Sequence, residues 1–175
     1  KKSELSLNAC IVACVKKSTP SLAISANGSS SVIKEVIDGN RIVICEDSIV
    51  RGTQLKNFTV NKLWECGAKE IHVRPACPPL IHGCKFLNFS RSRSVLDLAG
   101  RRAVKEMGEG REQLSEYANA ESERHAAMVE RIRHRLGLTS LKYQKLSDLV
   151  SAIGLPKQKL CTYCWDGAEP CGGCP

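Results

Sequence analysis

The amino-acid sequence, 175 residues long, has few aromatic residues and no long apolar segment. No apolar run approaches the roughly 20 residues that a membrane helix needs, so we expect no membrane span. Aromatic residues make up only 5% of the chain, which leaves little surface for stacking on nucleic-acid bases. The first residue is Lys1 and not Met, and no signal peptide is recognisable, although trimming would remove one. We therefore expect a fragment or a trimmed chain.

What the chain does contain is typical of a globular protein. Apolar residues make up 42%, charged residues make up 25%, and the formal net charge is +8. This composition excludes a fully disordered chain, and the length favours one domain. Part of the positive charge gathers at Arg91, Arg93, Arg101 and Arg102. We interpret this cluster as a solvated helix face or a surface that attracts anions, and we do not expect nucleic-acid binding.

Cysteine is frequent, with ten residues. Cys45 and Cys66 fall within apolar periodic segments, where a buried thiol is the ordinary interpretation. Residues 161–164 and 171–174 each have the CxxC spacing that places two sulfurs on one metal. The tail that carries them has too little apolar content to order itself without sulfur chemistry. Metal binding is the leading hypothesis, with redox-active thiols and inert or disulfide-bonded cysteines as alternatives.

Apolar periodicity predicts an α/β fold that contains one βαβ unit. Residues 41–45 (RIVIC) indicate a buried parallel strand, and 71–73 begin a second strand. Residues 54–66 between them have helical spacing, and Gly67 is placed to end that helix. Further helices are expected at residues 92–107, 122–136 and 146–153.

The strongest functional signal is the loop that leaves the first strand and enters the following helix. Ligands of open α/β sheets bind at this edge, where loop N–H groups and a helix N-terminus form an anion cradle. Ser48 and Thr53 add hydroxyl donors, and Gly52 permits close approach of the backbone. Glu46 and Asp47 would repel a phosphate but suit sugar hydroxyls or Mg²⁺. The loop therefore predicts a ribose 5-phosphate site, and the alternative is a capped surface loop.

Residues 41–53, RIVICEDSIVRGT, resemble the phosphoribosyl pyrophosphate (PRPP) motif of type I phosphoribosyltransferases. Within this group, DSIVRGTQ is similar to the amidophosphoribosyltransferase family. Further motifs follow in that family's order over about residues 32 to 169: GAKEIHVR, CPPLIHGC, LKYQKLSDLVSAIGLP and CTYC. The stretch CKFLNFSRSRS resembles versions of the enzyme from anaerobic bacteria.

The resemblance implies a partial type I phosphoribosyltransferase fold, with a parallel sheet and flanking helices. It divides the chain into an uncertain segment (1–31), a PRPP-binding part (32–90), a helical C-terminal region (91–160) and a Cys-rich metal-binding tail (161–175). The implied activity is that of a glycosyltransferase in purine biosynthesis. Ammonia from glutamine would displace pyrophosphate from PRPP, which gives 5-phosphoribosylamine and glutamate in the first committed step.

The family's motif also implies roles for the loop residues. Glu46 and Asp47 would contact the ribose hydroxyls and Mg²⁺, although many members carry Asp at the first position. The 5-phosphate of PRPP would be held by the rest of the motif, namely Ser48, Ile49, Val50, Arg51, Gly52 and Thr53. No side chain of the motif acts as a nucleophile, so catalysis would rest on positioning and charge.

A [4Fe–4S] cluster is a further implication of the resemblance. Its thiolate ligands in this chain would be Cys84, Cys161 and Cys164. The family's fourth ligand lies upstream of the PRPP motif, where Cys10 or Cys14 could stand in for it, although neither can be aligned with it. The rival hypothesis is a local site for Zn²⁺ or a cluster, made by Cys161, Cys164, Cys171 and Cys174.

The family's N-terminal catalytic cysteine and glutaminase domain do not occur in this sequence, and its pyrophosphate and hood loops are not recognisable. We therefore expect ammonia to come from a glutaminase domain outside these residues, and we do not expect this chain alone to turn over glutamine. We also expect a homo-oligomer in a reducing cytoplasm. The alternative functions are a PRPP-binding regulatory module without catalysis and a metal-stabilised remnant.

Overall fold

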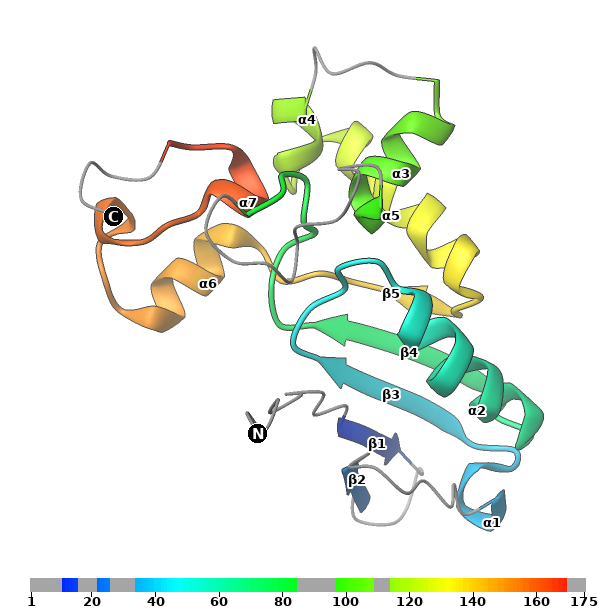
Figure 1. The fold of residues 1–175 in the computed structure, drawn as a ribbon. Helices are drawn as coiled ribbons and strands as arrows, with labels where there is room; N and C mark the ends of the chain where they lie inside the picture. The colour runs from blue at the N-terminus through cyan, green and yellow to red at the C-terminus, as the bar shows by residue number, and fades with distance from the viewer. Residues whose placement is uncertain (1–10, 16–21, 26–33, 85–96, 109–113, 170–175) are drawn as a thin grey trace, which may run out of the picture.

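The fold is built on a five-stranded sheet, and α3, α4 and α7 lie beyond the edge of the sheet away from β1 and β2 (Figure 1). The computed structural model describes residues 11–15, 22–25, 34–84, 97–108 and 114–169. The strand order is β2-β1-β3-β4-β5. The strands are β1 (Ile11–Val15), β2 (Leu22–Ser25), β3 (Arg41–Glu46), β4 (Glu70–Pro75) and β5 (Ser140–Leu141).

The predicted βαβ unit is confirmed. β3 and β4 are parallel, with Ile42 beside Ile71 and Ile44 beside Val73, and β5 extends the sheet in parallel with β4. β1 is antiparallel to both β2 and β3. The helical elements are α1 (Lys34–Ile37), η1 (Leu55–Val60), α2 (Asn61–Glu65), α3 (Ala99–Glu106), α4 (Leu114–Ala118), α5 (Glu123–Leu136), α6 (Leu146–Ile153), η5 (Lys157–Lys159) and α7 (Tyr163–Asp166).

The helices bury one face of the β3–β4 pair. Ile42 and Ile44 on β3 are fully buried. Cys45, the next residue, points to the opposite face of the sheet and is exposed. The prediction that Cys45 is a buried core thiol is therefore wrong. Successive side chains of a strand point to opposite faces, so an unbroken apolar run does not by itself indicate burial on both faces. Cys66, after α2, is half-buried and packs against the core.

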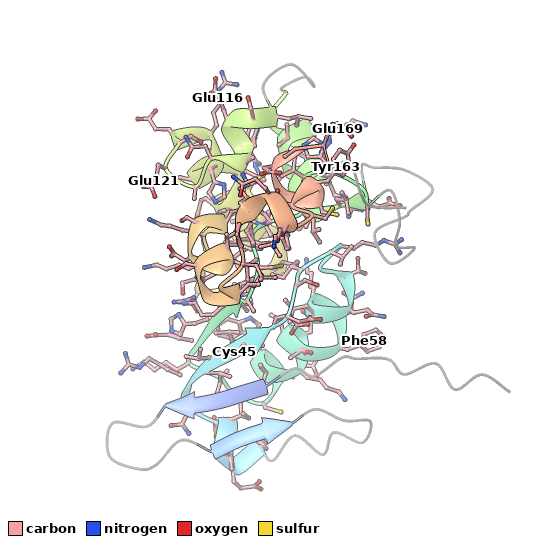
Figure 2. All side chains as sticks on the ribbon, turned by 90° about the vertical axis from the view of Figure 1, so that its left-hand side faces the viewer. Cys45, Phe58, Glu116, Glu121, Tyr163 and Glu169 are labelled. Carbon is pink, nitrogen blue, oxygen red and sulfur yellow. The ribbon has the colours of Figure 1, made fainter. Side chains whose placement is uncertain are left out.

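The helix expected at residues 54–66 begins as a π-helix, η1, and continues as α2. A π-turn has a wider spacing than an α-turn, and the buried residues of this segment are accordingly Leu55, Val60 and Leu63. Phe58, which fits an α-helical stripe, is 71% exposed (Figure 2). Gly67 ends the helix with a φ of +87°, as expected.

The later helices agree with their apolar patterns. The predicted helix at 122–136 is α5, whose Met128, Ile132 and Leu136 are buried, and the one at 146–153 is α6. Of the helix expected at 92–107, residues 92–96 lie outside the described ranges and α3 forms the later part. α3 corrects one interpretation of the basic cluster, because Arg101 is only 8% exposed and is not part of a solvated face. Arg91 and Arg93 lie outside the described residues.

Candidate functional site

The acidic loop (residues 46–53) begins at the carboxyl end of β3, which is the sheet edge that the sequence predicted for it. The carbonyl of Glu46 accepts a hydrogen bond of 2.8 Å from the N–H of Ala76, just after β4. Glu46 is half-buried and Asp47 is exposed. The Oδ1 atom of Asp47 accepts a hydrogen bond of 2.7 Å from the N–H of Ser48. The two carboxylates are thus held at the edge where ligands of parallel sheets bind.

Packing against α3 and α5 holds the middle of the acidic loop. Ile49 is 3% exposed, and the carbonyl of Val50 accepts a hydrogen bond of 2.8 Å from Ala99 at the start of α3. Gly52 is buried and has a φ of +76°. A Cβ atom at Gly52 would lie 2.8 Å from the Cδ2 atom of Leu136. The loop conformation therefore requires glycine at this position on two independent grounds, backbone angle and space.

The end of the acidic loop presents donors for an anion. Within the described part of the chain, the backbone N–H groups of Arg51, Gly52 and Thr53 donate no hydrogen bond to another backbone group. Thr53 and Arg51 are exposed, and the carbonyl of Gly52 begins the helical hydrogen bonding by accepting from Lys56 at 2.9 Å. These N–H groups precede the η1–α2 helix, where the helix dipole favours negative charge.

Residues 76–84, which we call the connecting segment, follow β4. The segment begins at Ala76, which lies beside Glu46 of the acidic loop, and ends at Cys84. Residues 78–81 are buried, and α3 packs so closely that a Cβ atom at Gly100 would lie 2.8 Å from the carbonyl oxygen of Leu80. The N–H groups of Ile81 and His82 both donate to the carbonyl of Cys164 in α7, at 2.9 and 3.0 Å. The connecting segment therefore joins the acidic loop to the C-terminal tail.

The three cysteines predicted as cluster ligands, Cys84, Cys161 and Cys164, lie in one region, and we call them the cysteine cluster. Cys161 is exposed, while Cys84 and Cys164 are half-buried. Burial, the interaction with Cys84 and the proximity of Cys161 raise the pKa of Cys164 to about 12. The six cysteines whose side chains the structure describes form no disulfide among themselves. Two segments far apart in the sequence thus bring three thiols together.

Thiolates are the ligand type that iron–sulfur clusters and Zn²⁺ take, so the chemistry of the cysteine cluster fits either group. Among the residues that the structure describes, however, no three His, Cys, Asp or Glu side chains are arranged closely enough to hold a metal. Cys171 and Cys174 of the rival site lie outside the described residues, as does Cys10. Cys14 pairs with Ile42, at the end of β3 opposite the acidic loop.

Cys77 occupies a place that the sequence did not reveal, in the connecting segment between the two sites. Burial raises the pKa of its thiol to about 11, with an opposing contribution from Trp165 and a smaller raising contribution from Asp47. The Trp165 indole lies near this thiol, but its nitrogen is buried and makes no hydrogen bond to any of the described residues. Tyr143, just after β5, also lies close to Cys77. Burial is the main cause that raises the pKa of the Tyr143 hydroxyl, and the charge of the Cys77 thiolate adds to it.

No family model matches the chain. Over 139 residues, or 79% of its length, the chain is 34% identical to the amidophosphoribosyltransferase of Mycobacterium tuberculosis. It is 33% identical over 138 residues to the enzyme of that name from Methanothermobacter thermautotrophicus. Its relatives are amidophosphoribosyltransferases. The chain spans only 22% and 23% of the length of these two relatives.

A solved structure agrees with the sequence relatives. The chain resembles glutamine PRPP amidotransferase from B. subtilis, complexed with ADP and GMP, with 27% identity and a TM-score of 0.50. The likeness covers 79% of this chain and 25% of that protein. The predicted fold, a parallel sheet with flanking helices of the phosphoribosyltransferase type, is thereby confirmed. Relatives named as amidophosphoribosyltransferases favour the enzyme over the regulatory module.

None of the described helices is long and apolar enough to cross a membrane.

Proposed function

We propose that the chain is the PRPP-binding part of an amidophosphoribosyltransferase. In this reaction ammonia displaces pyrophosphate from C1 of PRPP, which gives 5-phosphoribosylamine. The acidic loop carries the proposal, because it leaves β3 with two carboxylates, Glu46 and Asp47, and ends on the unoccupied N–H groups of Arg51, Gly52 and Thr53. Similarity to amidophosphoribosyltransferases over 79% of the chain supports it.

The proposed mechanism is one of positioning. The N–H groups at the end of the acidic loop bind the 5-phosphate, with the hydroxyl groups of Ser48 and Thr53 as additional donors. Glu46 and Asp47 orient the ribose hydroxyls, and their negative charge favours the positive charge that develops near C1 as pyrophosphate leaves. Fixing the sugar at both ends holds C1 in place for the incoming ammonia.

Mg²⁺ fits the oxygen donors of Glu46 and Asp47, since this ion binds through one or two carboxylates together with substrate oxygens. It would supply charge neutralisation for the pyrophosphate group. Asp47 is exposed at the sheet edge, and its Oδ1 atom already accepts the N–H of Ser48. The side chain is therefore oriented before any ion binds.

The cysteine cluster is proposed as the site of a [4Fe–4S] group, held by Cys84, Cys161 and Cys164 with a fourth ligand outside the described residues. Its role would be to fasten the C-terminal tail to the connecting segment. Anaerobic purification followed by iron and sulfide analysis tests this assignment. Bound zinc without sulfide would contradict it and favour the rival Zn²⁺ site.

The remaining parts of the proposal concern partners. The ammonia would come from a glutaminase domain of the longer enzyme, because the chain corresponds to less than a quarter of the relatives' length. A homo-oligomer in the cytoplasm fits such an enzyme and the reduced thiols of the cysteine cluster. Size measurement by light scattering tests the oligomeric state.

Calorimetric titration of the chain with PRPP, with and without Mg²⁺, tests the proposed function. We expect Mg²⁺-dependent binding that Asp47→Asn weakens at least about tenfold, which is about 1.4 kcal/mol. The matched control is Asp148→Asn on α6, which removes the same charge from an exposed position away from the acidic loop. Absence of PRPP binding, or equal weakening by both substitutions, would contradict the proposal.

A further inference from the structure

We propose that Trp64 is a positioning residue, which holds the phosphate-binding end of the acidic loop in place through the last turn of α5. The inference rests on the proposed function of the acidic loop and deepens it, because it identifies what supports the N–H groups of Arg51, Gly52 and Thr53. Trp64 itself lies on α2, outside the acidic loop, and acts on the loop through a neighbouring helix.

The first contact joins α2 to the end of α5. The indole Nε1 of Trp64 donates a hydrogen bond of 2.9 Å to the carbonyl of Gly137. Gly137 ends α5 with a φ of +70°, so its carbonyl lies beyond the hydrogen bonding of the helix. A carbonyl at a helix end needs a partner from elsewhere, and the indole of Trp64 is such a partner.

The second contact joins the same turn of α5 to the acidic loop. Leu136 directly precedes Gly137 and is only 2% exposed. A Cβ atom at Gly52 would lie 2.8 Å from the Cδ2 atom of Leu136, so the two residues are packed without spare room. Because the N–H of Gly52 is one of the donors proposed for the 5-phosphate, Leu136 packs directly against the phosphate-binding end of the loop. We call the Trp64–Gly137 and Leu136–Gly52 contacts together the α5 support.

The sheet fixes the last turn of α5 on its other side. The N–H of Thr139 donates to the carbonyl of Ile71 on β4 at 2.8 Å. In return, the N–H of Ile71 donates to the hydroxyl oxygen of Thr139 at 2.9 Å. With β4 on one side and Trp64 on the other, the turn has a defined place. Closely packed groups transmit small displacements, so the place of the turn determines the place of Leu136 against Gly52.

The η1–α2 helix completes the arrangement. It begins at Leu55, two residues after the acidic loop, and it carries Trp64 near its end. η1 also packs against α5. The acidic loop is therefore connected to α5 both directly, at Gly52, and through the helix that follows it. Loss of the Trp64 indole N–H breaks one of these two connections and leaves the fold in place, so we expect the loop to become more mobile.

Three substitutions test the α5 support. Trp64→Phe keeps an aromatic ring but removes the indole N–H, and a folded protein is expected because Trp64 is 38% exposed. Leu136→Val shortens the side chain that meets Gly52 and breaks the α5 support at its other contact. Trp165→Phe is the matched control, since the same change there removes an indole N–H that makes no hydrogen bond to any described residue.

The first experiment measures backbone hydrogen exchange by NMR in the ligand-free chain. The reporter is the N–H of Lys56, which donates to the carbonyl of Gly52 at 2.9 Å. The reference is the N–H of Leu149 at the start of α6, which donates to Lys145 at 3.0 Å. We expect both variants of the α5 support to speed exchange at the reporter at least about fivefold, and the control to change it less than about twofold. The reference should change less than about twofold in all three proteins.

The second experiment measures binding of ribose 5-phosphate and PRPP by calorimetric titration. We expect Trp64→Phe to weaken both ligands by the same factor, about fivefold, because both carry the 5-phosphate. The factor by which Mg²⁺ strengthens PRPP binding should stay unchanged, since Mg²⁺ is proposed to act at Glu46 and Asp47. Asp47→Asn should give the reverse pattern, with the effect of Mg²⁺ reduced and ribose 5-phosphate weakened less than PRPP. A merely structural role of Trp64 would not separate these quantities.

The outcomes separate the inference from the proposed function. Failure of the wild type to bind either ligand contradicts the proposed function, and the exchange experiment then decides the inference. Unchanged exchange at Lys56 in Trp64→Phe overturns the inference. Faster exchange at Leu149 to the same extent as at Lys56, or equal weakening of ribose 5-phosphate by Trp64→Phe and Trp165→Phe, would show a general loosening of the fold and would also overturn it.

Discussion

The acidic loop and the cysteine cluster are built in opposite ways. The acidic loop is one continuous stretch of the chain, which β3 and the η1–α2 helix hold at its two ends and α3 and α5 hold from the side. The cysteine cluster joins Cys84 to Cys161 and Cys164, which lie on a separate segment near the C-terminus. Figure 2 shows Tyr163, on the same short helix as Cys164, at the end of the molecule away from β1 and β2.

This difference shows where each site obtains its order. The acidic loop has a buried anchor, Ile49. It also has a backbone conformation with positive φ at Gly52 that favours glycine, so the protein fold itself holds the loop. The cysteine cluster is held differently, because α7 spans only Tyr163–Asp166 and contains no buried residue. Its fixed points are Thr162, which is 4% exposed, and the carbonyl of Cys164, which accepts from Ile81 and His82. Packing of apolar side chains thus orders the acidic loop, whereas hydrogen bonds to the backbone and one buried threonine hold the cysteine cluster.

The largest effect that separates the two sites is expected from Cys164→Ser. We expect this substitution to abolish most iron uptake on anaerobic reconstitution, because it removes a soft thiolate ligand. Cys45→Ser is the control, since Cys45 is exposed on the open side of β3 and has no proposed role (Figure 2). Bound iron per chain is the measurement, and equal uptake by both variants would show that the cysteine cluster holds no metal.

Thiol reactivity sharpens the comparison at Cys77, which lies between the sites. Burial raises the pKa of this thiol from 9.0 to about 11, so its reactive thiolate fraction at pH 8 falls roughly a hundredfold. We expect iodoacetamide to modify exposed Cys45 far faster than Cys77 in the native chain, and the Cys77 rate to rise up to about pH 11. Mass spectrometry of peptides measures both rates. Similar rates at pH 8 would show that Cys77 is not protected by packing.

Gly52→Ala tests whether the fold itself orders the acidic loop. The positive φ and the close contact with Leu136 should together destabilise the protein by about 2–4 kcal/mol, measured by urea unfolding. Gly137→Ala is the matched control, because Gly137 has a φ of +70° but nothing within 4 Å of the added Cβ. We expect it to cost about 1 kcal/mol. If the two variants were equally stable, the contact with Leu136 would not contribute to loop order.

The smallest effect is expected from Gly167→Ala. Its Cβ would displace the His82 ring, a movable side chain, so the added cost over strain alone is on the order of 1 kcal/mol. Gly154→Ala, with a φ of +74° and open space around the Cβ, controls for strain. Because the two glycines differ in their contact with His82, faster hydrogen exchange at residues 81–84 is expected only in Gly167→Ala. Faster exchange in both would contradict the contact.

The elements that could be predicted are those whose pattern is local. The helix expected at residues 122–136 is α5, whose buried stripe has helical spacing and whose end is a glycine, Gly137; the structure adds the N-cap at Ser122. The wider π-turn of η1 could not be predicted, since the sequence of 54–66 also fits an α-helix and packing decides between them. β5 was missed as well, because Ser140–Leu141 is a strand only through pairing with β4.

For the candidate site, the acidic loop could be predicted because its residues are contiguous and its chemistry is explicit in the sequence. The link between the two sites could not be predicted. The hydrogen bonds from Ile81 and His82 to Cys164 are bonds between backbone groups, which carry no residue signature. The neighbours of Cys77 come from after β3, after β5 and from α7, so only folding brings them together.

The sequence by itself determined the βαβ unit and the acidic loop between its strand and helix, since alternation, helical spacing and turn residues act over short distances. It also identified Cys84, Cys161 and Cys164 as candidate metal ligands, which stays a prediction. Only the tertiary structure decided that Cys45 is exposed, that Arg101 is buried, and that the connecting segment joins the acidic loop to α7. The burial of a side chain and the contacts between distant segments depend on which segments pack together, and this packing is a property of the whole fold.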